Sequence, residues 1–208
     1  MTTSRDEQKK ATREAILEAA RQCFEVEGYE KASVRDIARA AGVSAGSVIH
    51  HFGSKRELLY ATLFEDLEAT MSEALSLGTS PPLAGQIEAM TRHIFACYGR
   101  RPRLSRVLLK ESLFAEEPWA SRFRAQTERL HGGVEGLAGD AVRRGELFPE
   151  VDTRLLAMAY VSFYYFALLA WAQGGHEDPT RLVSVQMAQH LRGLNSARTT
   201  GGEDGVSI

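Results

Sequence analysis

Apolar residues in the first part of the chain recur at the spacing of an amphipathic helix. Ile16, Ala20 and Phe24 lie four residues apart and form one apolar stripe. Gly28 follows this stripe and predicts the end of the helix. No proline occurs before Pro81, and the apolar positions up to that point do not alternate as they do in a strand. The pattern therefore predicts a run of helices.

Two capping signals mark where further helices begin. Ser33 is followed three residues later by Asp36, and Ser54 is followed by Glu57, which completes a full capping box. Leucine and phenylalanine residues at helical spacing continue the second of these helices beyond the box. Residues 77–82, Leu-Gly-Thr-Ser-Pro-Pro, then interrupt the pattern, and their small number favours a helix–helix connection over a flexible linker.

Helical spacing resumes after this interruption. The glycines Gly132, Gly133, Gly136 and Gly139 fall inside one of the later helices, where each costs about 1 kcal/mol relative to alanine. Either that helix breaks there, or neighbouring backbones approach it closely. No β-hairpin signal occurs, so the predicted class is all-α. The five later helices are expected over residues 83–98, 103–115, 118–144, 152–173 and 179–194.

The composition is that of a globular protein from a reducing compartment. The chain has 208 residues, and at roughly 150 residues per domain it holds one or two domains. Two cysteines are too few for a disulfide scaffold, and the polar first ten residues predict no secretory signal, so we expect a cytoplasmic protein. A net charge of −2 excludes a globally cationic nucleic-acid coat but allows a locally basic DNA-reading surface.

Residues 34–52, VRDIARAAGVSAGSVIHHF, contain the features that a helix-turn-helix requires. Ala38 provides the small residue where the helices cross, and Gly42 tolerates a positive φ in the turn. Ser44 is suited to cap the second helix, over residues 45–51. The alternative, an ordinary helical hairpin in a core, is disfavoured by these matches at fixed offsets. The apolar positions that lock the two helices together are Ile37, Ala41, Val43 and Val48.

The stretch from about Thr12 to Leu63 resembles the DNA-binding domain of the tetracycline-repressor (TetR) family. The resemblance covers about a quarter of the chain. It implies a three-helix DNA-binding domain over residues 1–54 and a larger helical ligand-binding and dimerisation domain over 55–195, before a polar tail over 196–208 that we expect to be disordered. The residues that carry it are Ile16, Leu17, Ala19, Ala20, Phe24, Gly28, Tyr29, Ser33 to Ala38, Ala41 to Ser44, Gly46, Ser47, Phe52 and Ser54 to Leu59, and later Arg144 to Leu147, Pro149 and Asp152.

The resemblance implies roles for individual residues. The second helix of the motif enters the major groove, and the residues that meet base edges there are Ala45, Gly46, Ser47, Ile49 and His50. Lys55 matches the lysine that grips a phosphate at the start of the fourth helix. Tyrosine is usual in the family where this chain has Ile49, so we expect a thinner direct readout. A solvated charged face is the alternative for any one of the basic residues near the motif. Other residues expected on the phosphate side are Lys9, Lys10, Arg13, Ser33, Arg35, Ser44, His51 and Arg56.

Residues 155–172 contain no charge over a length that would just span a membrane. Tyrosines and Ser162 in the middle would need hydrogen-bond partners in lipid, and no Lys or Arg flanks the far end. Both observations favour a central helix of a protein with no membrane partner. The resemblance implies that residues 155–173 and 179–194 form the interface of a homodimer.

The second half of the chain is rich in aromatic residues. The resemblance implies a cavity there for a small effector, which would be apolar or aromatic. Packing in the core is the alternative for any one of these residues. The candidates for the cavity are Met90, His93, Phe95, Tyr98, Phe114, Phe123, Gln126, His131, Tyr160, Phe163 and Tyr164.

Two further motifs carry weaker signals. The basic run Arg100, Arg101, Arg103 and Arg106 is interpreted first as a solvated loop, with contact to an anionic ligand or DNA as the alternative. A carboxylate-bundle metalloenzyme needs two Glu-x-x-His motifs, and this chain has one, which ends at His131. Adjacent His50 and His51 do not suit a metal ion. The resemblance implies a ligand-responsive repressor that binds a near-palindromic DNA operator as a dimer. We expect no cofactor, metal or enzymatic activity.

Overall fold

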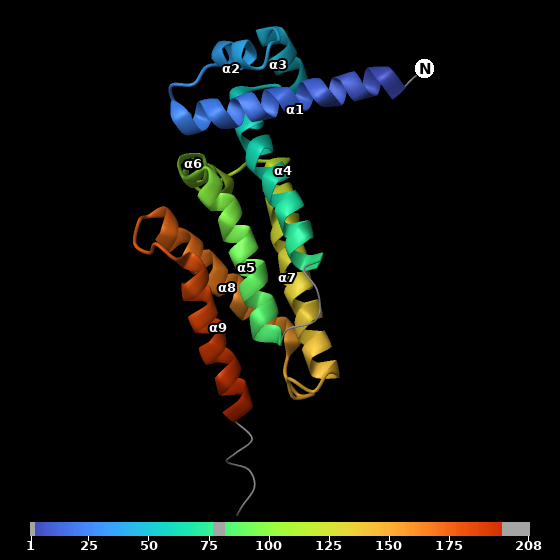
Figure 1. Cartoon of the computed structure of the whole chain (residues 1–208), viewed down its shortest axis with the longest axis vertical. Coiled ribbons are helices and arrows are strands. Elements are labelled where there is room, and N and C mark those ends of the chain that lie inside the picture. Colours follow the sequence, from blue (N-terminus) through green and yellow to red (C-terminus); the bar gives the residue numbers. More distant parts are fainter. Residues whose placement is uncertain (1–2, 77–81, 197–208) are drawn as a thin grey trace, which may run out of the picture. The chain divides into compact units, whose positions relative to one another are not determined.

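A computed structural model describes residues 3–76 and 82–196 of the chain (Figure 1). The described residues form helices and no strand, which confirms the all-α class. Residues 77–81 and 197–208, which hold most of the expected connection and of the expected tail, lie outside the described residues. The helices are α1 Thr3–Val26, α2 Val34–Ala40, α3 Ala45–Phe52, α4 Lys55–Ser76, α5 Leu83–Arg100, α6 Pro102–Leu113, α7 Trp119–Arg143, α8 Thr153–Ala172 and α9 Pro179–Ser196.

The chain divides into two compact units, each of which takes residues from two stretches of sequence. Unit 1 comprises Met1–Thr70 and Ala96–Arg124, and unit 2 comprises Met71–Phe95 and Ala125–Ile208. Helices α4, α5 and α7 therefore contribute to both units. The boundary expected after residue 54 separates a DNA-binding domain from a ligand-binding domain, whereas these two units are defined by their internal contacts. The expected boundary therefore stays a prediction.

Unit 1 is built on α1, which contacts α2 and α6. The apolar stripe predicted on α1 is buried, with Ile16 and Ala20 fully covered and Phe24 almost so. The first turns of α1 extend past α2 and α3, and residues 4–11 are all exposed (Figure 1). The buried half of α1 thus holds the unit together, while its N-terminal half remains open to solvent.

Serine side chains cap α2 and α4 as predicted. Ser33 accepts a hydrogen bond from the backbone N–H of Asp36 at 3.2 Å, and Ser54 accepts one from that of Glu57 at 3.1 Å. The full capping box expected at Ser54 is wrong in its second half. The Glu57 carboxylate accepts from the indole N–H of Trp119 instead, and the backbone N–H of Ser54 donates to the carbonyl of Phe52.

Helix α7 runs without a break through its glycine cluster, so of the two alternatives the broken helix is wrong. Close approach explains one of the glycines, because a Cβ built on Gly133 would collide with the side chain of Leu75. The space beside Gly132 and Gly136 is open. The partner at Gly133 is thus a side chain of α4 and not a neighbouring backbone.

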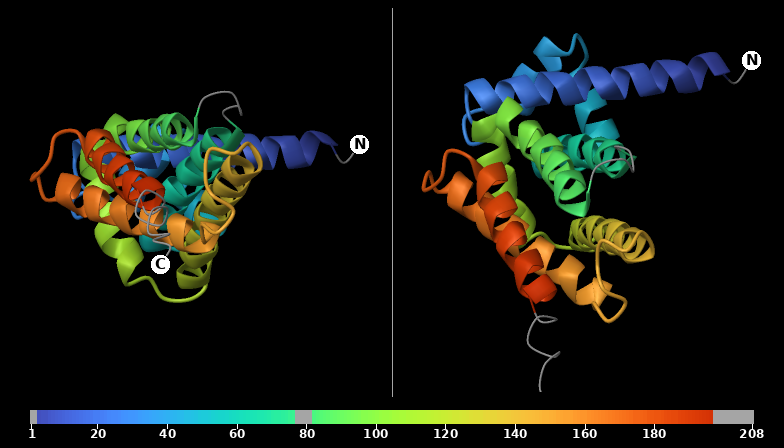
Figure 2. Two further views of the ribbon diagram at one scale, coloured as in Figure 1. Left: turned by 90° about the horizontal axis from the view of Figure 1, so that it is seen from below. Right: turned by 60° about the horizontal axis from the view of Figure 1, so that its bottom comes forward.

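Helices α8 and α9 lie side by side as an antiparallel pair in unit 2 (Figure 2). Asp152 caps α8 by accepting from the backbone N–H groups of Arg154 and Leu155, both at 3.0 Å. Among the described helices, α8 alone is long and apolar enough to cross a membrane. Its most apolar 18 residues have a mean hydropathy of 1.7, and 33% of them are buried. The core helix of a soluble protein can have the same length and hydropathy.

Candidate nucleic-acid interface

The turn between α2 and α3 has the geometry that a helix-turn-helix needs. The N–H of Val43 donates to the carbonyl of Ala38 at 2.9 Å, and that of Gly42 donates to the carbonyl of Arg39 at 3.2 Å, which is the Schellman pattern at a helix end. Gly42 has a φ of +68°, a conformation that glycine adopts without strain. Ser44 then caps α3 by accepting from the N–H of Ser47 at 3.0 Å. The motif predicted over residues 34–52 is present.

Buried side chains fix α3 by one face and leave the other open. Val48 and Phe52 point into the core of unit 1, where Ile37 and Ala38 of α2 are also buried. The opposite face carries Ile49, whose exposed fraction is 45%, together with other predicted base-reading residues. Gly46 and His50 are exposed, and Ala45 and Ser47 are half-buried.

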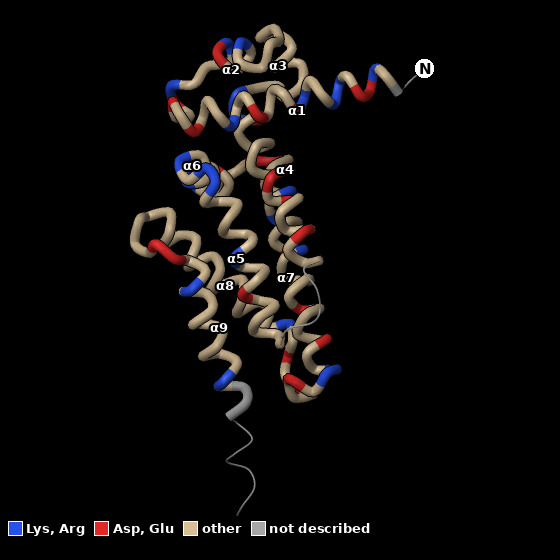
Figure 3. Tube along the Cα trace, viewed as in Figure 1, with Lys and Arg blue, Asp and Glu red and all other residues tan. Residues whose placement is uncertain are grey.

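Helix α3 contains no Lys, Arg, Asp or Glu, and charged residues surround it on α1, α2 and the start of α4 (Figure 3). Its only titratable residues are His50 and His51. Burial lowers the pKa of His51 below its ordinary value of 6.5, and the nearby charges of His50, Lys9 and Arg13 lower it further. The electrostatic effect of Lys9 and Arg13 on His51 indicates that α1 carries positive charge to the C-terminal end of α3.

Arg13 of α1 connects that helix to α3 and α4. Its guanidinium lies over the ring of Phe52 at 5.0 Å and forms an ion pair with Glu65. The ion pair raises the pKa of Arg13, chiefly through the hydrogen bond to Glu65. Arg13 is therefore placed beside α3, with part of its hydrogen-bonding capacity used inside unit 1.

Lys55 is engaged by the loop that follows α1. Its Nζ donates to the carbonyl oxygens of Tyr29 at 2.8 Å and Ala32 at 3.1 Å, with that of Glu30 at 3.5 Å. The ammonium also lies 4.4 Å from the centre of the Tyr29 ring. An ammonium group has three N–H donors. Contact with a phosphate would therefore require Lys55 to leave these carbonyl groups.

A reciprocal pair of caps joins the end of α1 to the start of α6. The Glu25 carboxylate accepts from the backbone N–H groups of Arg103 at 3.3 Å and Leu104 at 2.7 Å. In return, the guanidinium of Arg103 donates to the carbonyl of Val26 at 2.9 Å. Gly28, with a φ of +88°, leaves the space for this guanidinium, because a Cβ there would lie 2.6 Å from Arg103 Nη2.

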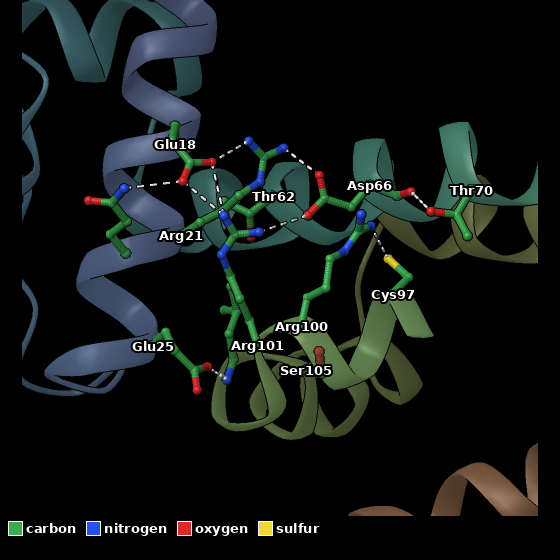
Figure 4. Close-up of polar contacts among 12 residues, drawn as sticks. Glu18, Arg21, Glu25, Thr62, Asp66, Thr70, Cys97, Arg100, Arg101 and Ser105 are labelled. Carbon is green, nitrogen blue, oxygen red and sulfur yellow. Dashed lines mark hydrogen bonds and ion pairs between the residues drawn. The ribbon is translucent and has the colours of Figure 1, made fainter. Parts of the chain in front are cut away.

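A half-buried network of ion pairs ties α1 to α4 and to the α5–α6 turn (Figure 4). Arg21 pairs with Asp66 at 2.6 Å, and Arg101 pairs with Glu18 at 2.8 Å. Arg101 also lies 3.9 Å from Asp66, whose pKa is raised because burial outweighs the lowering effect of Arg21, Arg101 and Arg100.

The interpretation of the basic run as a solvated loop is therefore wrong for Arg101 and Arg103, which bind α1. Arg100 donates to the sulfur of Cys97 on α5 instead, and Arg106 is exposed. No local pattern around Arg101 indicates its distant acidic partners.

The predicted effector-binding residues in unit 1 have different surroundings. Phe114 follows α6 with an exposed fraction of 82%, and Tyr98 is buried. Phe123 belongs to a ring cluster with Tyr60 and Trp119, whose ring centres lie 5.9 Å from its own. Phe123 is thus involved in packing α7 against α4.

The other predicted effector-binding residues lie in unit 2. The rings of Phe95 and Tyr164 are 5.5 Å apart, and those of Tyr160 and Tyr164 stack at 6.2 Å. The hydroxyl groups of Thr91 and Tyr160 are hydrogen-bonded at 3.1 Å, and burial raises the pKa of Tyr160. Phe163 contacts the ring of His190. Met90 and Gln126 are buried, whereas His93 and His131 are half-buried.

A metal site has no support within the part of the chain that the structure describes. No three His, Cys, Asp or Glu side chains gather there as metal ligands would. His131, the end of the Glu-x-x-His motif, lies 3.9 Å from Glu135 on the same helix. No observation among the described residues therefore supports the alternative of a carboxylate-bundle enzyme.

An exposed second helix, fixed by a buried face on a first helix, defines a helix-turn-helix DNA-binding protein. The profile described as "Bacterial regulatory proteins, tetR family" matches residues 16–62. The HTH-type transcriptional repressor Rv1474c of Mycobacterium tuberculosis is 32% identical over 179 residues, which cover 84% of this chain and 89% of that protein. The chain therefore belongs to the TetR family of transcriptional regulators and is a DNA-binding regulator.

Solved structures agree with this assignment. The TetR family transcriptional regulator PfmR of Thermus thermophilus has a TM-score of 0.62 at 25% identity, and the match covers 86% of this chain and 98% of that chain. A TetR transcription regulator of Haloarcula marismortui has a TM-score of 0.74 at 18% identity, over 88% and 97% of the two chains. The second likeness concerns the fold alone.

Proposed function

We propose that this regulator is a cytoplasmic, homodimeric repressor that binds a near-palindromic operator and is released by a small apolar or aromatic effector. The observation that carries the proposal is the open face of α3, which a packed helix-turn-helix presents to solvent. A two-fold axis through a dimer would place two copies of α3 in successive major grooves, about 34–36 Å apart. A palindromic operator matches that symmetry.

The residues on and around α3 divide into two groups in this proposal. Ile49 is exposed and apolar, and it suits contact with a thymine methyl group. Ala45, Gly46, Ser47 and His50 share the helix and are the other base-reading candidates. The phosphate-contacting candidates are Arg13, Ser33, Arg35, Ser44 and His51. Lys55 would join them only by leaving the carbonyl groups of Tyr29 and Ala32.

The proposed dimer forms through α8 and α9, where large apolar side chains remain exposed. On α8 the exposed fractions are 58% for Leu155, 51% for Met158, 54% for Phe166 and 39% for Leu169. These positions are three, eight and three residues apart, and at 3.6 residues per turn they lie on one side of the helix. Val185 of α9 is 55% exposed. An apolar face of this extent is typical of a surface covered by a partner, here a second copy.

The dimer is tested by the mass of the protein in solution. Phe166→Glu places a charge in the proposed interface and is expected to shift the light-scattering mass from dimer to monomer. Phe114→Glu is the matched control, because Phe114 is also exposed but follows α6 in unit 1. A monomeric wild type, or a Phe166→Glu variant that remains dimeric, would contradict the proposed interface.

The operator is tested by selecting bound sequences from random duplex DNA with the purified full-length protein. The expected result is an inverted repeat whose half-sites are about one helical turn apart, or a multiple of it. An enriched site without a repeat would refute two-fold binding. Recovery of no sequence at all would refute the operator proposal itself.

A further inference from the structure

Gln86, on α5 in unit 2, has a buried side-chain amide with no hydrogen-bond partner among the described residues. The residue is 3% exposed, and neither its Oε1 nor its Nε2 is bonded. An amide buried in this way carries a large desolvation cost, and buried polar groups in proteins almost always have a partner. No described residue supplies that partner, so a water, a residue outside the described ranges or a ligand would have to do so.

Other buried polar side chains of unit 2 do have partners. The hydroxyl of Thr91, five residues further along α5, donates to the carbonyl of Ile87 at 2.6 Å and lies 3.1 Å from the hydroxyl of Tyr160. Gln126 of α7 is 4% exposed and also has an interaction partner. Gln186 of α9 is only half-buried, and it has one buried atom without a partner, its Oε1. Gln86 therefore differs from its neighbours, because its donor and acceptor are both unused.

Gln86 shares one face of α5 with two residues that the sequence analysis placed at the effector site. Gln86, Met90 and His93 are four and three residues apart, which aligns them along the helix. Met90 is 1% exposed, and half-buried His93 lies 3.1 Å from Glu73 through its Nε2. The face thus carries a half-buried imidazole at His93, a buried thioether at Met90 and a buried, unpaired amide at Gln86.

We propose that Gln86 is the polar anchor of the effector site and that the effector carries a neutral amide-type group, such as a carboxamide or a lactam. The inference rests on the proposed function, since it assumes that unit 2 binds an effector. The unpaired Oε1 requires a donor, and the unpaired Nε2 requires an acceptor. A carboxylate has no donor and an ammonium has no acceptor, whereas an amide supplies both. A neutral group also avoids the greater cost of burying a charge.

Benzamide and benzoate test the proposal, because they share a ring and differ in the group offered to Gln86. Calorimetric titration of the full-length protein is expected to show benzamide binding at least about tenfold more tightly than benzoate. Gln86→Leu keeps the bulk of the side chain, removes the amide, and is expected to weaken benzamide binding about tenfold. Gln22→Leu, on an exposed site of α1 in unit 1, is the control and should bind benzamide as the wild type does.

The thermal stability of the ligand-free protein gives an independent readout. Gln86→Leu removes an unpaired amide and is expected to raise the Tm by about 2–4 °C. Gln126→Leu removes an engaged amide and is expected to lower the Tm. A lower Tm for Gln86→Leu would show that the amide has a permanent partner, such as a buried water, and would overturn the proposal.

Two outcomes of the titration would also overturn it: no benzamide binding, or equal affinities for benzamide and benzoate. The titration contains no DNA, so its failure is distinguishable from failure of the proposed function. A wild type that binds its selected operator without preferring benzamide removes only the role of Gln86. A wild type that binds no operator removes the repressor proposal, whatever the titration shows.

Discussion

Lys55 has two competing uses, and its substitution distinguishes them. The family resemblance implies that it grips a DNA phosphate, whereas in the structure its Nζ donates to the carbonyl groups of Tyr29 and Ala32. We expect the second use to dominate, so that Lys55 holds the loop after α1 against the start of α4. Lys55→Met keeps the apolar stem of the side chain and removes only the ammonium.

The expected cost of Lys55→Met follows from these contacts. Hydrogen bonds that involve a charged group contribute about 1.5–3 kcal/mol in total, and a cation over an aromatic ring contributes about 0.5–1 kcal/mol. Lys55 is half-buried, so solvent screening reduces the sum to about 2 kcal/mol. For a chain of 208 residues, that loss lowers the Tm by about 4–8 °C. Thermal unfolding followed by circular dichroism measures it.

The salt dependence of operator binding reports on phosphate contacts directly. Each lost contact reduces the slope of log K against log salt by about 0.9, so a dimer that loses one per protomer changes by about 1.8. Lys55→Met is expected to leave this slope unchanged. Arg35→Gln is the matched control, because Arg35 is exposed on α2, has no partner among the described residues and is a proposed phosphate contact. It should reduce the slope and leave the Tm unchanged.

The opposite pattern would refute this reasoning. A Lys55→Met variant with the Tm of the wild type and a slope reduced by about 1.8 would show that the ammonium leaves the carbonyl groups for the DNA. The carbonyl contacts would then be a resting position of the free protein.

Two further predictions concern the reciprocal caps and the histidines. Gly28→Ala is expected to cost about 2 kcal/mol, because alanine is strained at positive φ and its Cβ displaces Arg103, whereas Gly174→Ala, at a φ of +78° with open space beside it, should cost only about 1 kcal/mol. Equal losses in thermal unfolding would contradict the role of Arg103. Operator affinity should fall as pH rises from about 6 to 8, because a protonated His51 favours phosphate and a nearby phosphate raises its depressed pKa, so that binding takes up a proton. The double variant His50→Gln/His51→Gln should lack this dependence, and a slope equal to that of the wild type would exclude the histidines.

Local signals in the sequence were sufficient to predict the helix-turn-helix. The caps at Ser33 and Ser44 and the positive φ at Gly42 each depend on residues no more than five positions away, and the structure contains all three. The glycines of α7, in contrast, were ambiguous, because local signals do not determine their role. Whether Gly133 breaks a helix or admits a neighbour depends on Leu75, which lies far from it in sequence.

The basic run at the start of α6 shows why the rest could not be predicted from local pattern. Arg101 finds its carboxylate on Glu18, 83 residues earlier, and Arg103 finds its carbonyl on Val26, 77 residues earlier. A charge run has the same local appearance whether it faces water or a distant acidic side chain. Gln86 is the converse case. A polar residue on an amphipathic helix suggests exposure, and only the packed structure shows that Gln86 is buried and has no hydrogen-bond partner. In both cases the informative quantity is the match between a polar group and its surroundings, which tertiary packing determines.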